Sequence, residues 1–279
     1  MSAPPTIFIT GATDGLGRGL AAAIAPSGAR LLVHGRDPRR ISATMSVLEP
    51  HVTGGLASYR ADLASLDEVR ALAAEVREGE ERLDVLVNNA GIGARTPGGG
   101  DRQTSADGLE LRFAVNYLAP FLLTRELLGL LRASAPSRIV NVSSAGQWAI
   151  DFDDVMLERG YDGTRAYCQS KLAQVMSTFE LADRLAADGV TANTLHPATS
   201  MPTTMVRAAG VAPVSSLEEG LEATARLVAD PALERVTGRY FNGACESRAD
   251  PQAYDAAARR RLWELSERLT GTGPATALR

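Results

Sequence analysis

Lysine is nearly absent from this sequence, and cysteine and histidine are scarce. Of the 29 basic residues one is a lysine, Lys171, and the other 28 are arginines. Cys168 and Cys245 are too few for a disulfide framework and stand in no metal-binding spacing. The three histidines lie far apart in the sequence and near no cysteine pair. We therefore expect no metal site, and a reducing cytoplasm as the location.

Long apolar runs and clusters of positive charge are also missing. No apolar stretch approaches the roughly 18 residues that a membrane span needs, and no basic segment precedes an apolar one near residue 1, as in a signal peptide. The net charge is −4 and the arginines are scattered, which indicates no basic surface for nucleic acid. We expect a soluble protein whose partner is a small molecule, with no membrane or nucleic-acid partner.

The single lysine follows a tyrosine at helical spacing. Tyr167 and Lys171 are four residues apart, so on a helix both side chains reach one small site. A free tyrosine titrates near pH ~10, and proton transfer near neutrality asks for a shift of roughly 3 units, about 4 kcal/mol. One charge about 4 Å away at an effective dielectric of ~20 supplies about that much. The pair therefore predicts a tyrosine that donates and accepts a proton, although this spacing also arises by chance.

Short aliphatic runs alternate with helical stretches along the whole chain. This order predicts an α/β fold with a doubly wound parallel sheet of about seven strands and helices on both faces. The predicted strands are 6–10, 30–34, 57–61, 85–88, 138–143, 190–196 and 239–242. The predicted helices are 15–25, 38–48, 66–78, 105–132, 164–187, 217–229 and 251–269. We expect one domain, residues 1–279.

Two segments, 145–163 and 197–216, carry no clean periodicity. Long loops in compact domains are usually functional or mobile, and these two flank the helix of Tyr167 and the sixth strand. We expect both to be substrate loops.

A glycine-rich turn joins the first predicted strand to the first helix. Residues 10–17 read TGATDGLG, with glycines at 11, 15 and 17. Glycines at such a turn let backbone amides approach a pyrophosphate, whose charge the helix N-terminus favours. The spacing differs from the dinucleotide fingerprint Gly-x-Gly-xx-Gly. The turn predicts a dinucleotide site, whereas a glycine turn alone also simply ends strands.

Further motifs follow in a fixed order from Thr10 to about Pro197. They are Asn88-Asn89-Ala90-Gly91 after the fourth strand, Asn116 in a long helix, Ser143-Ser144 after the fifth, and the Tyr167-Lys171 pair. Together with the glycine turn, this set resembles the short-chain dehydrogenase/reductase (SDR) family. The resemblance implies a single NAD(P)-binding domain of Rossmann type.

The resemblance also implies catalytic roles. Tyr167 would be the general acid that protonates a carbonyl oxygen, and Lys171 would lower its pKa and hold the nicotinamide ribose. Ser144 would hydrogen-bond the substrate oxygen, with Ser143 as its nearest competitor. Asn116 would support a proton-relay water near the lysine, or else be a helix-packing amide.

A larger set is implied to hold the cofactor. It comprises Gly11, Thr13, Gly15, Leu16, Gly17, Arg36, Arg40, Asp62, Leu63, Asn89, Ala90, Gly91, Tyr167, Lys171, Pro197 and Thr199. Asn88 would steady the central strand. Asp62 would contact adenine with Leu63, or would merely cap the next helix.

The residues after the second strand favour NADP over NAD. NAD-binding members usually end this strand with an acid that grips the ribose, and here Gly35 stands at that position with Arg36 after it. An arginine fork there would bind the 2′-phosphate. Asp37 is the rival, because it lies 20 residues past Gly17. It precedes Pro38, however, and this pair indicates a helix N-cap.

Two departures from the family pattern concern the substrate. Ser144 and Tyr167 are 23 residues apart, which is longer than usual and resembles retinol dehydrogenases and similar reductases of bulky apolar carbonyls. The insert would be either an apolar substrate wall or a short amphipathic helix packed on its own domain. Ala198 and Pro202 replace a usual glycine and threonine, so Thr199 and Thr203 both remain candidates to meet the nicotinamide.

These expectations combine into one leading function. It is an NADP-dependent ketone or aldehyde reductase, reversible as an alcohol dehydrogenase, for a moderately large and mainly apolar substrate. The alternative is a non-catalytic NADP-binding sensor or scaffold, for which the intact Asn116, Ser144, Tyr167 and Lys171 set would be superfluous. The family also implies a homodimer or homotetramer, often through the helices that here contain Asn116 and Tyr167.

Overall fold

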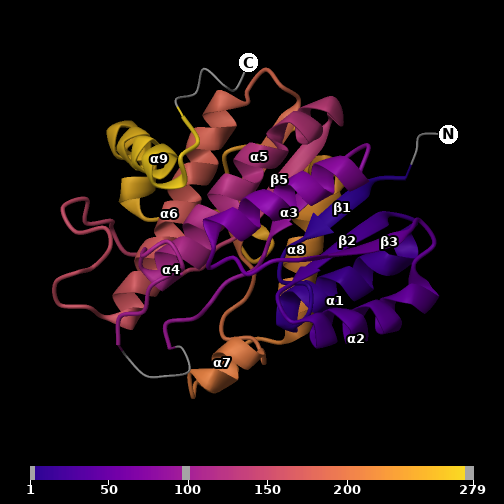
Figure 1. Cartoon of the computed structure of the whole chain (residues 1–279), viewed down its shortest axis with the longest axis horizontal. Coiled ribbons are helices and arrows are strands. Elements are labelled where there is room, and N and C mark those ends of the chain that lie inside the picture. The colour runs from indigo at the N-terminus through magenta and orange to yellow at the C-terminus, as the bar shows by residue number, and fades with distance from the viewer. Residues whose placement is uncertain (1–3, 96–100, 274–279) are drawn as a thin grey trace.

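A twisted sheet of eight strands forms the centre of the molecule (Figure 1). The computed structural model describes residues 4–95 and 101–273. The strand order is β3-β2-β1-β4-β5-β6-β7-β8, parallel up to β7, and β8 runs antiparallel to β7. The strands are β1 Thr6–Ile9, β2 Arg30–Gly35, β3 Leu56–Arg60, β4 Val85–Asn88, β5 Ser137–Val142, β6 Val190–His196, β7 Tyr240–Asn242 and β8 Cys245–Ser247.

Helices cover both faces of this sheet, so its central strands β1 and β4 are buried at every position instead of alternating between buried and exposed residues. The α-helices are α1 Gly15–Ile24, α2 Pro38–Leu48, α3 Leu66–Gly79, α4 Leu111–Phe113, α5 Ala119–Ala133, α6 Gly163–Arg184, α7 Thr204–Ala208, α8 Leu217–Ala229 and α9 Ala256–Thr270. The successive residues Ile7, Phe8 and Ile9 of β1 point alternately into two hydrophobic cores. One core packs α1 and α8 against the sheet, and the other packs α3, α5, α6 and α9.

The order of the strands creates the site. From β1 the chain proceeds outward to β3 and then returns to place β4 on the other side of β1. The loops after β1 and β4 therefore diverge to opposite faces, and a crevice opens at the carboxyl ends of these strands. The predicted doubly wound parallel fold is thus confirmed, and all the described strands belong to one sheet.

The long helix predicted over 105–132 begins later than expected. Asp107 and Gly108 form a turn, with Gly108 at φ +76°, and a bridge between Thr104 and Glu110 closes the loop. The helix then starts at Leu111 and contains a π-helical turn, Ala114–Leu118, before α5. By length and composition Leu111–Ala133 could cross a membrane, but 78% of its apolar window is buried inside the protein. Here it is a core helix.

The C-terminal part also differs from the prediction. An eighth strand, β8, follows β7 through a turn at Gly243, whose φ of +60° suits glycine. The single helix expected over 251–269 is divided into a 3-10 turn, Pro251–Tyr254, and α9. The carboxylate of Asp255 causes the break, because it accepts hydrogen bonds from the first backbone amides of α9.

Candidate active site

A cleft of about 780 Å³ lies at the carboxyl edge of the sheet. Its walls are the loops after β1 to β6, together with α6 and α7. Nearly all the predicted site residues line it: Gly11, Thr13, Gly15, Leu16, Arg36, Arg40, Asp62, Leu63, Asn89, Ala90, Gly91, Ser144, Tyr167, Lys171, Pro197 and Thr199. Gly17 and Asn116 do not line the cleft. Each of them has a packing or hydrogen-bonding role instead.

The glycine turn lines the cleft in a conformation that requires glycine. Gly11 and Gly15 have φ of +65° and +48°, a region that side chains rarely tolerate. A Cβ on Gly11 would lie 2.8 Å from the Cα of Ala90. Gly17 instead allows close packing, because a Cβ there would lie 2.4 Å from the Asn89 side chain. The N-terminus of α1, which begins at Gly15 beside the cleft, fits the pyrophosphate of a dinucleotide.

His34 supports this turn through its buried imidazole, a role that no sequence motif indicated. The backbone N–H of Gly11 donates to Nδ1 of His34 over 3.2 Å, so Nε2 carries the proton and donates to the Ala61 carbonyl over 3.1 Å. Burial lowers the pKa of His34 to about 4. The imidazole is therefore neutral at pH 7 and links β1, β2 and β3 beneath the cofactor end of the cleft.

The last residue of β2 is Gly35, not an acid, and the nearest acid in the cleft wall is Asp37, two residues further on. A Cβ at Gly35 would lie 2.6 Å from Cγ2 of Thr13, so the position leaves no space for an acidic side chain. The carboxylate of Asp37 accepts from the amides of Arg39 and Arg40 at 2.8 and 3.4 Å, which confirms the predicted N-cap of α2.

Arg36 and Arg40 line the cleft beside this cap. Arg40 also forms an ion pair of 2.8 Å with Asp14, and both side chains are partly exposed. Burial raises the pKa of Asp14, but hydrogen bonds from Thr204, Arg40 and the Gly15 amide outweigh that effect and lower it overall. Asp14 thus stays charged and connects the glycine turn with α2 and α7, a link that the sequence did not suggest.

Asp62 and Leu63 lie at the same end of the cleft. The carboxylate of Asp62 accepts from the Ala64 amide over 3.0 Å, whereas Ser65 caps α3. Asp62 is therefore not the helix cap that was considered as the alternative, and its side chain lines the cleft.

The proposed acid and its partners meet at the other end. Tyr167 lies in the first turns of α6, and Ser144, two residues past β5, lines the cleft beside it. Burial raises the pKa of Tyr167, and the nearby Ser144 hydroxyl partly opposes this rise. Ser143 points elsewhere, because its hydroxyl is buried and donates to the Lys171 carbonyl over 2.9 Å. The geometry thus favours Ser144 over Ser143 as the substrate-binding serine.

Lys171 lies one turn further along α6, deep in the protein. Its ammonium donates to the Val142 carbonyl over 2.8 Å and to Oε1 of Gln174 over 3.4 Å, and it lies 5.9 Å from the centre of the Tyr167 ring. Burial lowers the pKa of Lys171 to about 8. The expected depression of the Tyr167 pKa by this charge is wrong for the protein alone, because burial of the phenol is the larger influence.

Asn116 is fully buried in the π-helical turn and does not line the cleft. Its side chain accepts from the Ile92 amide over 2.7 Å and donates to the Ile92 carbonyl and to Ser170, both at 3.0 Å. The side chain thus joins the loop after β4 to α6. π-Turns often occur at functional sites, and this one aligns Asn116 with that loop.

The segment 197–216 contributes to the cleft as expected. Thr199 and Thr203 both line it, which leaves the choice between them open. Thr199 interacts with His196 over 3.1 Å, and the Thr203 hydroxyl caps α7. Met205 and Val206 of α7 add apolar surface to the same wall.

The insert 145–163 is neither of the two structures considered for it. Only its first residues, Ala145 and Gly146, line the cleft, so it is not an apolar wall of this site. It contains no helix either, although Ile150 and Val155 are buried in the core. In the turns at 151–159, aspartate carboxylates accept hydrogen bonds from backbone N–H groups. These local hydrogen bonds compete with the backbone hydrogen bonds of a helix.

A buried arginine attaches this insert to the cleft. Arg112 is fully buried and donates to the carbonyls of Gly93 and Ala94, at 3.0 and 2.7 Å, and to the hydroxyl of Tyr161. Glu110, also buried, supplies the opposite charge at 3.5 Å. The contacts fix the loop after β4, which lines the cleft, against the insert.

Comparisons with known proteins agree with this geometry. A family model described as short chain dehydrogenase matches residues 5–212. Retinol dehydrogenase 13 of Mus musculus is 40% identical over 285 residues, covering 95% of this chain and 84% of that protein. A solved protein of Mycobacterium paratuberculosis, described as uncharacterised, has a TM-score of 0.77 at 30% identity and covers 97% of this chain and 96% of its own.

One further solved structure was determined with a cofactor. It is described as the RhlG/NADP active-site complex of Pseudomonas aeruginosa. Its TM-score is 0.69 at 27% identity, and the match covers 86% of this chain and 94% of that one.

Proposed function

Because this chain belongs to the short-chain dehydrogenase/reductase family, an oxidoreductase family, we propose that it is an NADP-dependent enzyme that interconverts a carbonyl and an alcohol. The substrate is moderately large and mainly apolar. The observation that carries the proposal is the meeting of Ser144, Tyr167 and Lys171 in one cleft with the glycine turn.

The residues of the chain account for the proton in this reaction. A bound nicotinamide supplies or accepts the hydride. Tyr167 donates its phenolic proton to the carbonyl oxygen, and Ser144 holds that oxygen with a hydrogen bond. Since burial keeps the Tyr167 pKa high, the phenol is protonated at neutral pH, the form that reduction requires. The Lys171 ammonium stabilises the phenolate that remains.

Removal of the Tyr167 hydroxyl tests this mechanism. Tyr167→Phe should lower kcat by about 10²-fold to 10⁴-fold, because the proton donor is lost, and should leave NADPH binding nearly unchanged. NADPH oxidation against long-chain and cyclic aldehydes and ketones measures turnover, and fluorescence titration measures binding. Full activity in the variant would exclude Tyr167 as the acid.

The preference for NADP rests on the residues after β2. Gly35 admits no acid, the carboxylate of Asp37 is engaged at the N-terminus of α2, and Arg36 lines the cleft. A guanidinium binds a phosphate with charge-assisted hydrogen bonds. The relative described with NADP supports the same choice.

Arg36→Ala should weaken NADPH binding about 10-fold to 100-fold, since a hydrogen bond between charged groups contributes about 1.5–3 kcal/mol. NADH, which lacks the phosphate, should bind the variant as it binds the wild type. Arg39→Ala is the matched control, because Arg39 is an exposed neighbour on α2 that does not line the cleft. Equal affinities for NADPH in Arg36→Ala and the wild type would contradict the assignment.

An apolar substrate fits the remaining wall of the cleft. Ile92, Leu111, Val115, Met205 and Val206 line it. The similarity to a protein named retinol dehydrogenase supports long, apolar primary alcohols and their aldehydes as the first compounds to test. A non-catalytic NADP-binding sensor remains the second hypothesis, favoured if NADPH binds and no carbonyl is reduced.

We also propose a cytoplasmic location and a homo-oligomeric assembly. The low cysteine content supports the cytoplasm. A homodimer or homotetramer is the arrangement implied by the family, and light scattering of the purified protein determines which one forms.

A further inference from the structure

Gln174 lies one turn beyond Lys171 on α6, and its side chain amide is buried and only half satisfied. The side chain is 2% exposed. Its Oε1 faces the Lys171 ammonium at 3.4 Å, and no described residue accepts a hydrogen bond from its Nε2. A buried amide N–H without an acceptor costs about 1–3 kcal/mol, so this group needs a partner.

The orientation of this amide is set by charge. If the amide were reversed, its N–H groups would face the three donors of the ammonium, and donors would oppose donors. Oε1 therefore points to Lys171 and Nε2 points away from it. The partner of Nε2 has to come from the other side.

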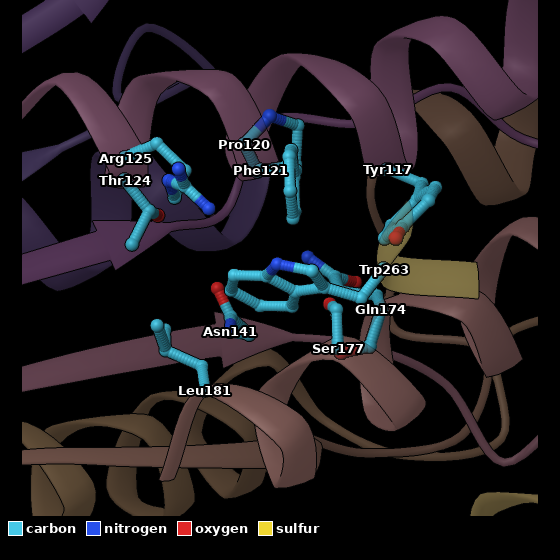
Figure 2. A pocket seen from close by; sticks show the side chains of 10 residues that line it. All are labelled: Tyr117, Pro120, Phe121, Thr124, Arg125, Asn141, Gln174, Ser177, Leu181 and Trp263. Carbon is cyan, nitrogen blue, oxygen red and sulfur yellow. The ribbon is translucent and has the colours of Figure 1, made fainter. Parts of the chain in front are cut away.

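A small cavity borders the Gln174 side chain, and Lys171 is not among the residues that line it (Figure 2). It measures about 20 Å³, the room of one ordered water, for which about 10–15 Å³ suffices. Gln174, Asn141, Ser177 and Thr124 give it polar walls, and Trp263 of α9 lies across it between α5 and α6. Polar walls with several hydrogen-bonding groups distinguish a hydrated cavity from a dry one.

We propose that one buried water in this cavity accepts from Nε2 of Gln174, and that Gln174 is thereby a positioning residue for Lys171. The water holds the amide so that its carbonyl stays on the ammonium. Gln174 touches neither the cleft nor a substrate, so it acts through the lysine. This inference concerns the role that Lys171 has in the proposed function, but its test does not depend on turnover.

The surroundings of Lys171 make this acceptor important. On α6 the titratable neighbour is Tyr167, and β5 contributes only the Val142 carbonyl. His196 at the end of β6 and the carboxylates of Asp14, Asp37 and Asp62 line the same cleft. None of them shifts the Lys171 pKa, which burial alone lowers to about 8. Neutral acceptors are thus the contacts that favour the charged amine.

The scarcity of lysine provides a direct measurement. Protein grown with ¹³C-labelled lysine has one lysine side chain, so its Cε resonance reports the titration of Lys171 alone. In Gln174→Leu, which loses the acceptor, the midpoint should move to lower pH by roughly one unit. In Gln174→Glu, which places a carboxylate of the same shape there, it should move to higher pH.

Ser177→Ala is the matched control, because Ser177 lines the cavity and bonds the Gln174 backbone but not the lysine. Its midpoint should stay close to that of the wild type. If Gln174→Leu does not fold, the upward shift of the Lys171 titration midpoint in Gln174→Glu is the result that tests the positioning role. Unchanged midpoints in the folded variants would overturn the positioning role whether or not any carbonyl is reduced. A high-resolution crystal structure with a dry cavity would overturn the water.

Discussion

Single buried residues beside the glycine turn decide how that turn responds to acid. His34 is the main example, because the Gly11 amide needs the neutral imidazole as an acceptor. Protonation at Nδ1 would replace that acceptor with a donor and would place a charge in a buried position. The turn is therefore built for the pH range in which His34 is neutral.

The sign of the pH effect follows from the lowered pKa. Between pH 6.5 and about 4 the unfolded chain binds a proton at His34 that the folded protein does not, so stability falls as the pH falls through this window. By the lower end the loss from this group is about 3 kcal/mol. His34→Gln does not titrate, so chemical denaturation at pH 7 and 4.5 should show a smaller loss of unfolding free energy in the variant. Equal losses in the two proteins would exclude His34 as the cause.

The motif residues that line the cleft were easier to predict than the buried residues that support them. Ser144, Tyr167 and Lys171 stand in motifs whose spacing places them together, and the structure does bring them into one cleft. His34 and Gln174 act through contacts between segments that are distant in the sequence or through burial, neither of which a local pattern reports. Their roles depend on hydrogen-bond partners that only the folded structure brings together.

At the scale of elements, the attachment of α9 depends on the side chain of Trp263. Trp263 is 2% exposed and inserts between α5 and α6 (Figure 2). Its ring centroid lies 4.9 Å from that of Phe121 in an edge-to-face arrangement, and the Arg184 guanidinium lies 4.4 Å from its ring centre. Its indole N–H and Arg125 both donate to Glu267, at 2.9 and 2.8 Å. The indole thus attaches α9 to the two helices beneath it.

Trp263→Ala should lower the free energy of unfolding by about 3–5 kcal/mol, the range for truncating a buried tryptophan. NADPH binding should persist in the fraction that remains folded, because Trp263 does not line the cleft. Trp148, the other tryptophan of the chain, is 49% exposed and serves as the control, with an expected change below about 0.5 kcal/mol on alanine substitution. Denaturation of the two variants compares them directly, and similar losses would contradict the anchoring role.

The position of α9 also bears on assembly. It packs on α6 (Figure 1), whose face was expected to contribute to a dimer. Trp263 occupies the space between α5 and α6 (Figure 2). A second copy that used the same face would contact α9 as well as α6. An interface of this kind could be disrupted by substitutions on the exposed side of α9 that leave Trp263 intact.

Elements with strong periodicity were predicted well, and elements that depend on distant contacts were not. The seven predicted strands and the turn at Gly11 follow from buried aliphatic runs and glycine spacing. The start of the long helix at Leu111 depends on a turn at Gly108, and the 145–163 segment depends on aspartate side chains that bind its own amides. β8 is a short edge strand with exposed side chains, so no apolar alternation marks it.

At the scale of the whole molecule, the arginine-rich composition has a chemical consequence. Primary amines condense with aldehydes to imines, whereas guanidinium groups are protonated at all physiological pH values and do not. The only side chain amine of this sequence is Lys171, and it is 4% exposed. Its surface cations are all guanidinium groups.

An enzyme that releases reactive aldehydes would thereby escape modification by its own product. Incubation with a long-chain aldehyde and cyanoborohydride, followed by peptide mass spectrometry, should give no side chain adduct on the folded protein and one at Lys171 after denaturation. An adduct on the folded protein would mean that the lysine is reached through the cleft. The use of arginine in place of lysine would then protect the whole surface of the protein from modification by aldehydes.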